Sequence, residues 1–176
     1  MVDIKAMDPT ILLDIRYATT NNFTGQKIYS SNKGYLQPDI AQRLVRVNGA
    51  LKKQNLRLKI FDAYRPLSVQ YRLWQIMPNE KFIANPATGS NHNRGAAVDC
   101  TLARADGTSL PMPSDFDDFS EMAYRSYQGG SETAKANRAL LEKVMAAEGF
   151  KPLASEWWHF DGPNWQKYPI TDLSLP

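Results

Sequence analysis

The stretch that decides the fold is SNHNRGAAVDCTL, residues 90–102. Its second half, from Ala96 to Leu102, is a short apolar run typical of a buried strand, and its only charged residue is Asp99. A buried carboxylate is costly unless a positive charge, several hydrogen-bond donors or a metal ion compensates it. Gly95 permits a sharp turn before the strand, so the preceding His92 can point to the same place as Asp99.

The chain has one other histidine, His159, at the end of the segment Glu156-Trp157-Trp158-His159. This short aromatic segment is bounded by prolines and a glycine, so we interpret it as a second strand. Two histidines and one carboxylate form a ligand set common for catalytic zinc, which leaves a fourth position for water. The two tryptophans beside Glu156 would raise its pKa toward the range useful to a proton shuttle.

Each of these residues also has a plainer interpretation. His92 could be a capping or hydrogen-bonding loop residue, and His159 an ordinary half-buried histidine beside aromatic rings. Asp99 could cap Thr101 or pair with Arg94. Residue types and spacing alone leave the choice between these interpretations and a metal site open.

The surrounding segments predict an α+β fold, with a small, mostly antiparallel sheet and helices packed on one side. Residues 1–36 suggest an irregular arm, and residues 115–130 an irregular acidic and aromatic rim. The periodicity and the turn residues predict helices over 38–55, 67–77 and 131–148, and strands over 56–61, 96–102 and 156–160, with a return strand at 110–112 after the Asp106-Gly107 turn. We expect residues 1–176 to form one domain.

Composition excludes several classes of protein. Of 176 residues, 43% are hydrophobic and 22% charged, which is normal for a soluble folded protein. The net charge of +3 comes from scattered basic residues, so we expect no nucleic-acid partner. Cys100 is the only cysteine, so an intramolecular disulfide is excluded. We interpret Cys100 as a core residue. No apolar stretch approaches the ~20 residues of a membrane helix, and the start lacks the regions of a signal peptide. We therefore expect a cytoplasmic protein, unless the sequence is that of a mature periplasmic form; nothing indicates the oligomeric state.

Two motifs carry a resemblance to a known family. Ser90-x-His92-x-x-Gly95-x-Ala97-x-Asp99, followed by Glu156-x-Trp158-His159, resembles the paired signature of the D-alanyl-D-alanine peptidases related to the zinc domain of hedgehog. Within that group, the sequence is most similar to the D-Ala-D-Ala dipeptidases of the vancomycin-resistance (VanX) type. The likeness spans almost the whole chain and includes residues 14–19, 22–25, 62–66 and 111–117.

The resemblance implies a hedgehog/DD-peptidase-like fold and a zinc metallopeptidase that hydrolyses the small dipeptide D-alanyl-D-alanine to two D-alanines. By this resemblance, one Zn²⁺ would be bound by His92, Asp99 and His159. Glu156 would be the catalytic base and acid, and Arg65 would stabilise the oxyanion. Ser90 would lie beside the substrate carboxylate, and Asp117 and Tyr17 beside the substrate ammonium. Without the family, Arg65 could simply pair with Asp62, Ser90 could be a turn residue, Asp117 a solvated acid and Tyr17 a core aromatic.

The sequence also departs from the family pattern. The segment between the Arg65 helix and Ser90 is short, Asn93 stands where serine is usual, and Pro113 stands where glycine is usual. These differences leave open a D,D-carboxypeptidase that acts on longer peptidoglycan stem peptides, and more distantly a non-catalytic zinc-containing binding module. Antibiotic resistance, recovery of D-alanine and cell-wall recycling would all use the same site.

Overall fold

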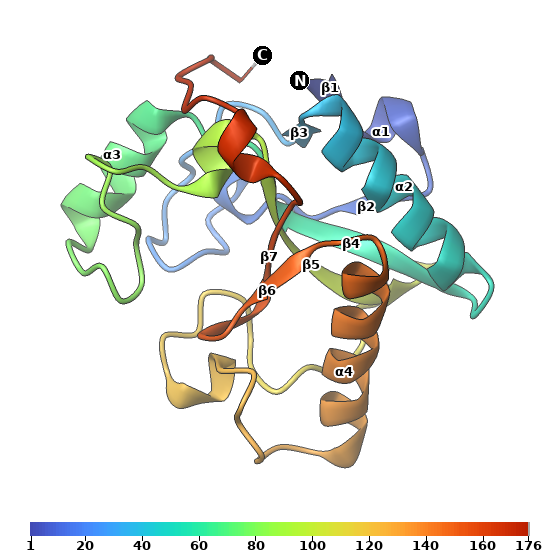
Figure 1. The fold of residues 1–176 in the computed structure, drawn as a ribbon. Helices are drawn as coiled ribbons and strands as arrows, with labels where there is room; N and C mark the ends of the chain where they lie inside the picture. The colour runs from blue at the N-terminus through green and yellow to red at the C-terminus, as the bar shows by residue number, and fades with distance from the viewer. Residues whose placement is uncertain (176) are drawn as a thin grey trace.

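The computed structural model of the protein describes residues 1–175. At its centre is a five-stranded sheet in the order β2-β4-β5-β7-β6 (Figure 1). β2 (Leu12–Leu13) runs parallel to β4 (Leu56–Asp62). The other neighbours, β5 (Ala97–Arg104), β7 (Glu156–Asp161) and β6 (Lys151–Leu153), pair antiparallel. The predicted α+β fold with a mostly antiparallel sheet is confirmed.

Two long helices pack against this sheet and against each other. α2 (Pro38–Lys52) begins with a proline at its first position and has Asp39 in its first turn. α4 (Glu132–Ala147) is capped by the Ser131 hydroxyl, which accepts a hydrogen bond of 3.1 Å from the Ala134 amide. Both helices were predicted from these signals. The third long helix, α3 (Leu67–Ile76), lies well apart from them (Figure 1).

The pairing of β4, β5 and β7 places apolar residues in the core at one end of the strands and a row of polar residues at the other end. Leu58 pairs with Leu102, and Ile60 pairs with Cys100; all four side chains are fully buried, as expected of a core cysteine. The register shifts after Ile60, where Asp62 comes opposite Asp99, and Asp99 in turn pairs with His159. Because residues that pair in register lie on the same face of a sheet, these three polar side chains form a row across β4, β5 and β7.

The prediction that residues 1–36 form an irregular arm is wrong. This part of the chain contains five short elements: β1 (Val2–Asp3), α1 (Ile4–Met7), β2, the 3₁₀ helix η1 (Arg16–Ala18) and β3 (Tyr35–Leu36). β1 pairs with β3, and β2 adds an edge strand to the main sheet. Strands of two residues are too short to show a periodicity, so the sequence alone could not indicate them.

One smaller expectation also fails, and one strand forms that was not predicted. The predicted return strand at 110–112 is reduced to an isolated bridge between Ala103 and Ser109, followed by one hydrogen bond from the Leu110 amide. Pro111 and Pro113 have no amide hydrogen to continue the ladder. Conversely, β6 forms despite Pro152, which is tolerated because β6 is an edge strand.

The remaining elements are single turns of 3₁₀ helix: η2 (Asn91–Arg94), η3 (Glu121–Ala123) and η4 (Trp165–Lys167). Within residues 1–175, no helix has both the length and the apolar character needed to cross a bilayer.

Candidate metal site and catalytic pocket

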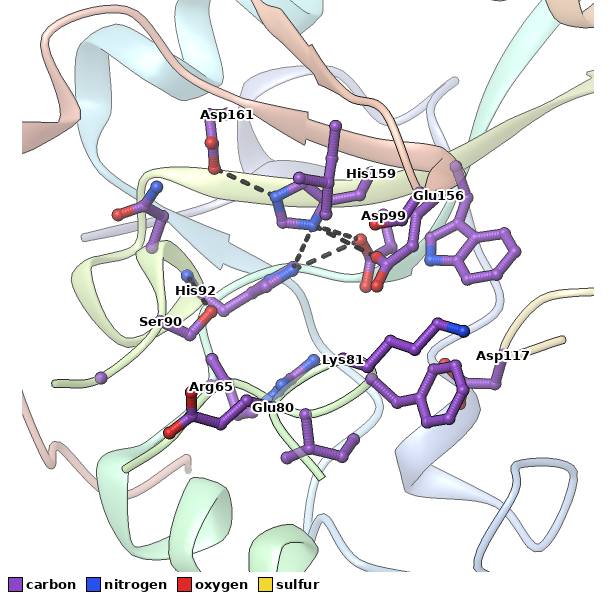
Figure 2. Close-up of a pocket in the computed structure, with 18 of the residues that line it drawn as sticks. Arg65, Glu80, Lys81, Ser90, His92, Asp99, Asp117, Glu156, His159 and Asp161 are labelled. Atoms are coloured by element: carbon purple, nitrogen blue, oxygen red, sulfur yellow. Dashed lines mark hydrogen bonds and ion pairs between the residues drawn. The ribbon is translucent and has the colours of Figure 1, made fainter. Parts of the chain in front are cut away.

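Three buried side chains converge at one point of the sheet (Figure 2). His92 comes from η2, Asp99 from β5 and His159 from β7, and their potential ligand atoms all lie within 4.8 Å of one another. Asp99 Oδ1 lies 3.3 Å from His92 Nε2 and 3.0 Å from His159 Nδ1. The two ring nitrogens are 3.2 Å apart. The structure therefore brings together the three residues predicted as metal ligands.

The local chain explains how His92 reaches the strands. Ser90 caps η2, with its hydroxyl accepting from the His92 amide at 3.3 Å. Gly95 then ends the turn in the left-handed region, with φ of +63°. The expected sharp change of direction at Gly95 is present, and it lets His92 face the strand that follows. Arg94 does not pair with Asp99, because it stacks on Trp165 and donates to the Tyr168 carbonyl.

In each histidine ring, the nitrogen that faces away from Asp99 (the outer nitrogen) already has a hydrogen-bond partner. His92 Nδ1 lies 2.7 Å from the Ala63 carbonyl oxygen, which can only accept, so this nitrogen carries the proton. His159 Nε2 lies 3.0 Å from the Asp161 carboxylate. The other (inner) nitrogens, His92 Nε2 and His159 Nδ1, thereby face the point beside Asp99, where a bound metal ion would take the place of a proton on Nδ1. Histidines that bind metals are held in this way by a carbonyl or a carboxylate.

The electrostatics of the cluster favour a cation. Burial lowers the pKa of His159, but its hydrogen bonds to Asp161 and Asp99 outweigh this and raise it to about 10. Burial likewise raises the pKa of Asp99, but the two histidines hold it well below its usual value. The carboxylates thus stabilise positive charge between the rings. Two imidazole nitrogens and one carboxylate oxygen are a donor set that suits Zn²⁺.

Glu156 lies beside this cluster at the start of β7. Its Oε2 atom is 3.9 Å from His159 Nδ1, so it is near the proposed metal position without joining the three ligand atoms. Burial raises its pKa, with a further contribution from the charge of Asp99, although His159 partly opposes the rise. The direction of this shift agrees with the raised pKa expected for Glu156, and burial is its main cause.

Arg65 is buried and held in one orientation. Its Nε and Nη2 atoms donate to Asp62 Oδ2 at 3.0 and 2.7 Å, and Nη1 donates to Gln70 Oε1 at 2.9 Å. The guanidinium carbon lies 5.3 Å from the centre of the Tyr17 ring. The ion pair with Asp62 that the plainer interpretation predicted does form, and the same guanidinium also lines the pocket that contains the metal cluster.

The residues predicted near the substrate line the same cavity, which has a volume of about 440 Å³. The Tyr17 hydroxyl donates to Asp117 Oδ2 at 2.9 Å. Asp117 is half-buried, with φ of +58°, and burial together with the charge of Asp99 raises its pKa well above the usual value. Asp117 is thus no freely solvated loop acid. Ser90 lies at the side of the cavity near His92 (Figure 2).

Sequence reasoning missed the residues that hold these groups in place. Asp161 follows His159 by two positions on the same strand, so its side chain points to the same face, a signal that could have been used. Gln70, which fixes Arg65, and the Ala63 carbonyl, which fixes His92, gave no signal, since their roles depend on how separate segments dock.

Comparison with known proteins places these observations in a family context. A family model described as D-ala-D-ala dipeptidase (peptidase M15) matches residues 1–173. The chain is similar to the D-alanyl-D-alanine dipeptidase of Escherichia coli strain K12, with 35% identity over 97% of this chain and 88% of that protein. It is also similar to the D-alanyl-D-alanine dipeptidase of Enterococcus faecium, with 31% identity over 93% and 91% of the two chains. Among solved structures, the vancomycin-resistance D,D-pentapeptidase VanY in complex with Zn(II) matches over 78% of each chain, with 16% identity and a TM-score of 0.47.

Proposed function

We propose an activity for this chain from the premise that it belongs to the D-Ala-D-Ala dipeptidase family, whose model matches residues 1–173. The proposed reaction is hydrolysis of D-alanyl-D-alanine to two molecules of D-alanine. The observation that carries the proposal is the convergence of His92 Nε2, His159 Nδ1 and Asp99 Oδ1 within 4.8 Å, with the outer nitrogen of each ring already bonded.

The proposed cofactor is one Zn²⁺ held by His92, Asp99 and His159. Bound there, zinc would polarise the scissile carbonyl and lower the pKa of water to about 7. The geometry leaves the side toward Glu156 and the cavity for water and substrate.

Glu156 is the proposed proton carrier. Its carboxylate accepts one proton from the attacking water as the oxygen bonds to the carbonyl carbon. It then delivers that proton to the amine nitrogen as the peptide C–N bond breaks. A raised pKa suits both halves of this transfer, because the group must be ionised first and protonated afterwards.

Arg65 is the proposed stabiliser of the charge that develops on the carbonyl oxygen. A guanidinium that Asp62 and Gln70 already hold costs little reorganisation during the reaction. Its third neighbour, Tyr17, keeps one face of the group away from water.

The two ends of the dipeptide have candidate partners in the same cavity. Asp117, supported by the Tyr17 hydroxyl, offers a carboxylate for the free ammonium. The Ser90 oxygen accepts from the His92 amide, which leaves its hydroxyl hydrogen able to be donated to the substrate carboxylate. Recognition of both charged ends would favour a dipeptide over a longer peptide.

The test is release of D-alanine from D-alanyl-D-alanine by the purified protein, before chelation, after chelation and after zinc is added back. We expect release that stops with the chelator and returns with zinc. A pentapeptide ending in D-Ala-D-Ala is assayed beside it and should be a much poorer substrate. Absence of release from a folded protein that carries one zinc would overturn the proposed activity, and equal or faster cleavage of the pentapeptide would overturn the dipeptide preference.

A further inference from the structure

We infer that Asn93 is a positioning residue that fixes Arg65 and Ser90 relative to each other, an inference that rests on the proposed function. Asn93 is fully buried in η2, directly after His92. Its side-chain Nδ2 donates to the Arg65 carbonyl oxygen at 2.9 Å. Its Oδ1 accepts from the Ser90 amide at 2.7 Å. One side chain therefore joins two residues that the proposed mechanism uses at different points of the substrate.

The main chain of Asn93 is itself firmly held. Its amide donates to the Ser90 carbonyl at 3.0 Å, and its carbonyl accepts from the Thr171 amide at 2.9 Å. The Thr171 hydroxyl adds a second contact to the same carbonyl at 3.3 Å. Thr171 also accepts from the Leu67 amide at 3.2 Å, at the start of α3. The C-terminal segment around Thr171 thus holds the main chain of Asn93 and connects it to α3, the helix that follows Arg65.

This link joins Arg65 to η2, the segment that carries His92. The partners of its guanidinium, Asp62 and Gln70, lie on β4 and α3, the two elements that flank Arg65 in the chain. These contacts orient the guanidinium, and neither is a hydrogen bond to η2. Among the hydrogen bonds of residues 1–175, two join Arg65 to η2: its amide donates to the His92 carbonyl at 3.1 Å, and its carbonyl accepts from Asn93.

Ser90 depends on Asn93 in a complementary way. The Ser90 amide is bonded to the Asn93 side chain, which fixes the main chain from which the hydroxyl projects. Arg65 is proposed to act at the scissile carbonyl and Ser90 at the terminal carboxylate, so Asn93 sets the spacing between these two contacts. A small error in such spacing can cost up to about a hundredfold in rate.

The experiment compares Asn93→Ala and Asn93→Asp with a matched control, Asn48→Ala. Asn48 is also fully buried and also bridges two groups, donating to Asp8 Oδ2 at 2.8 Å and accepting from the Leu58 amide at 2.9 Å. It lies on α2 and does not line the cavity. Both alanine variants should lower the melting temperature, whereas only Asn93→Ala should lower kcat, by about tenfold or more, and raise KM, with one zinc per chain retained.

Asn93→Asp separates the two contacts and serves as the second variant should Asn93→Ala fail to fold. When ionised, its carboxylate can still accept from the Ser90 amide but cannot donate to the Arg65 carbonyl, so the variants are compared at alkaline pH, where the carboxyl is ionised. We expect KM to return close to the wild-type value while kcat stays low. Exchange of the Ser90 amide hydrogen, measured on metal-free protein, should be fast in Asn93→Ala and slow in Asn93→Asp.

A double-mutant cycle with Arg65→Ala completes the test. If Asn93 acts on kcat through Arg65, Asn93→Ala should lower kcat much less in the Arg65→Ala background than in the wild type. The same fold-loss in both backgrounds, or wild-type kcat and KM in Asn93→Ala, would overturn the inference. A wild-type protein that does not cleave the dipeptide contradicts the proposed function instead, and unchanged Ser90 amide exchange in Asn93→Ala would then overturn the bridging role independently.

Discussion

The carboxylate of Glu156 lies 3.9 Å from the inner nitrogen of His159, yet it is not one of the three ligand atoms that converge on the proposed metal position. Removing it should therefore abolish proton transfer and leave the metal in place. We expect Glu156→Ala to bind one zinc and to lose between about 10²- and 10⁴-fold in kcat. Steady-state kinetics and metal analysis check this, with the exposed acid Glu132→Ala as control. Near-normal turnover in a zinc-loaded Glu156→Ala protein would contradict the assignment.

Asp161 illustrates a residue that acts through another. Its carboxylate accepts from His159 Nε2 at 3.0 Å and so directs the other ring nitrogen toward Asp99. We expect Asp161→Ala to weaken zinc binding by about 10- to 100-fold. Asp161→Asn keeps an acceptor oxygen and should lose less. Competition against a chelator measures both, with Asp106→Ala on an exposed turn as control. Equal zinc affinity in wild type and Asp161→Ala would contradict this role.

At the scale of elements, the short N-terminal segments are joined to the sheet by a buried polar cluster. The Asp8 carboxylate, which follows α1, accepts from Thr10 and from Asn48 on α2, and Asn48 accepts from the β4 amide of Leu58. Partial burial raises the pKa of Asp8, but the hydrogen bonds from Thr10 and Asn48 lower it more, so the net pKa lies below its usual value.

The sign of this shift predicts an acid-dependent loss of stability. With its pKa lowered in the folded state, Asp8 contributes stability above the pKa of the unfolded chain and loses it as the pH falls through the folded pKa. We expect Asp8→Asn to lower the free energy of unfolding by about 1 kcal/mol at neutral pH, and by progressively less below about pH 4. Urea unfolding of both proteins, metal-free, at several pH values measures the difference. A difference that does not change with pH would show that the charge of Asp8 is not responsible.

The elements also show what could be predicted from the sequence. α2, α4 and β5 are long enough to carry a proline start, a serine cap and an apolar run, so local chemistry decides them. β2 forms because it can pair with the edge of β4, and β6 because it can pair with the edge of β7. Both strands therefore depend on the tertiary structure and not on their local sequence. The same division applies to the site. His92, Asp99 and His159 are visible as rare polar residues in apolar surroundings, whereas the bonds from Gln70 and Asn93 to Arg65 depend on how separate segments dock.

At the scale of the whole molecule, the candidate metal site joins parts of the chain that are distant in sequence. Asp99 and His159 are 60 residues apart, and His92 and His159 are 67 residues apart. The row across β4, β5 and β7 places Asp99 between Asp62 and His159. A cation at this point would neutralise charge and connect η2 to both strands. Such a cation binds the folded chain far better than the unfolded one, so it should raise the stability of the entire molecule.

This coupling predicts that melting depends on zinc. A ligand present at a thousandfold excess over its Kd adds about 4 kcal/mol, which for a chain of this length raises the melting temperature by on the order of ten degrees. We expect that shift in the wild type and in Glu156→Ala, because the latter retains all three ligands. His92→Ala, which loses the ligand from η2, should show a much smaller shift. Thermal unfolding of chelated protein with and without added zinc gives the measurement. A shift of equal size in His92→Ala would mean that zinc stabilises the fold from another place, and the proposed ligand set would then be wrong.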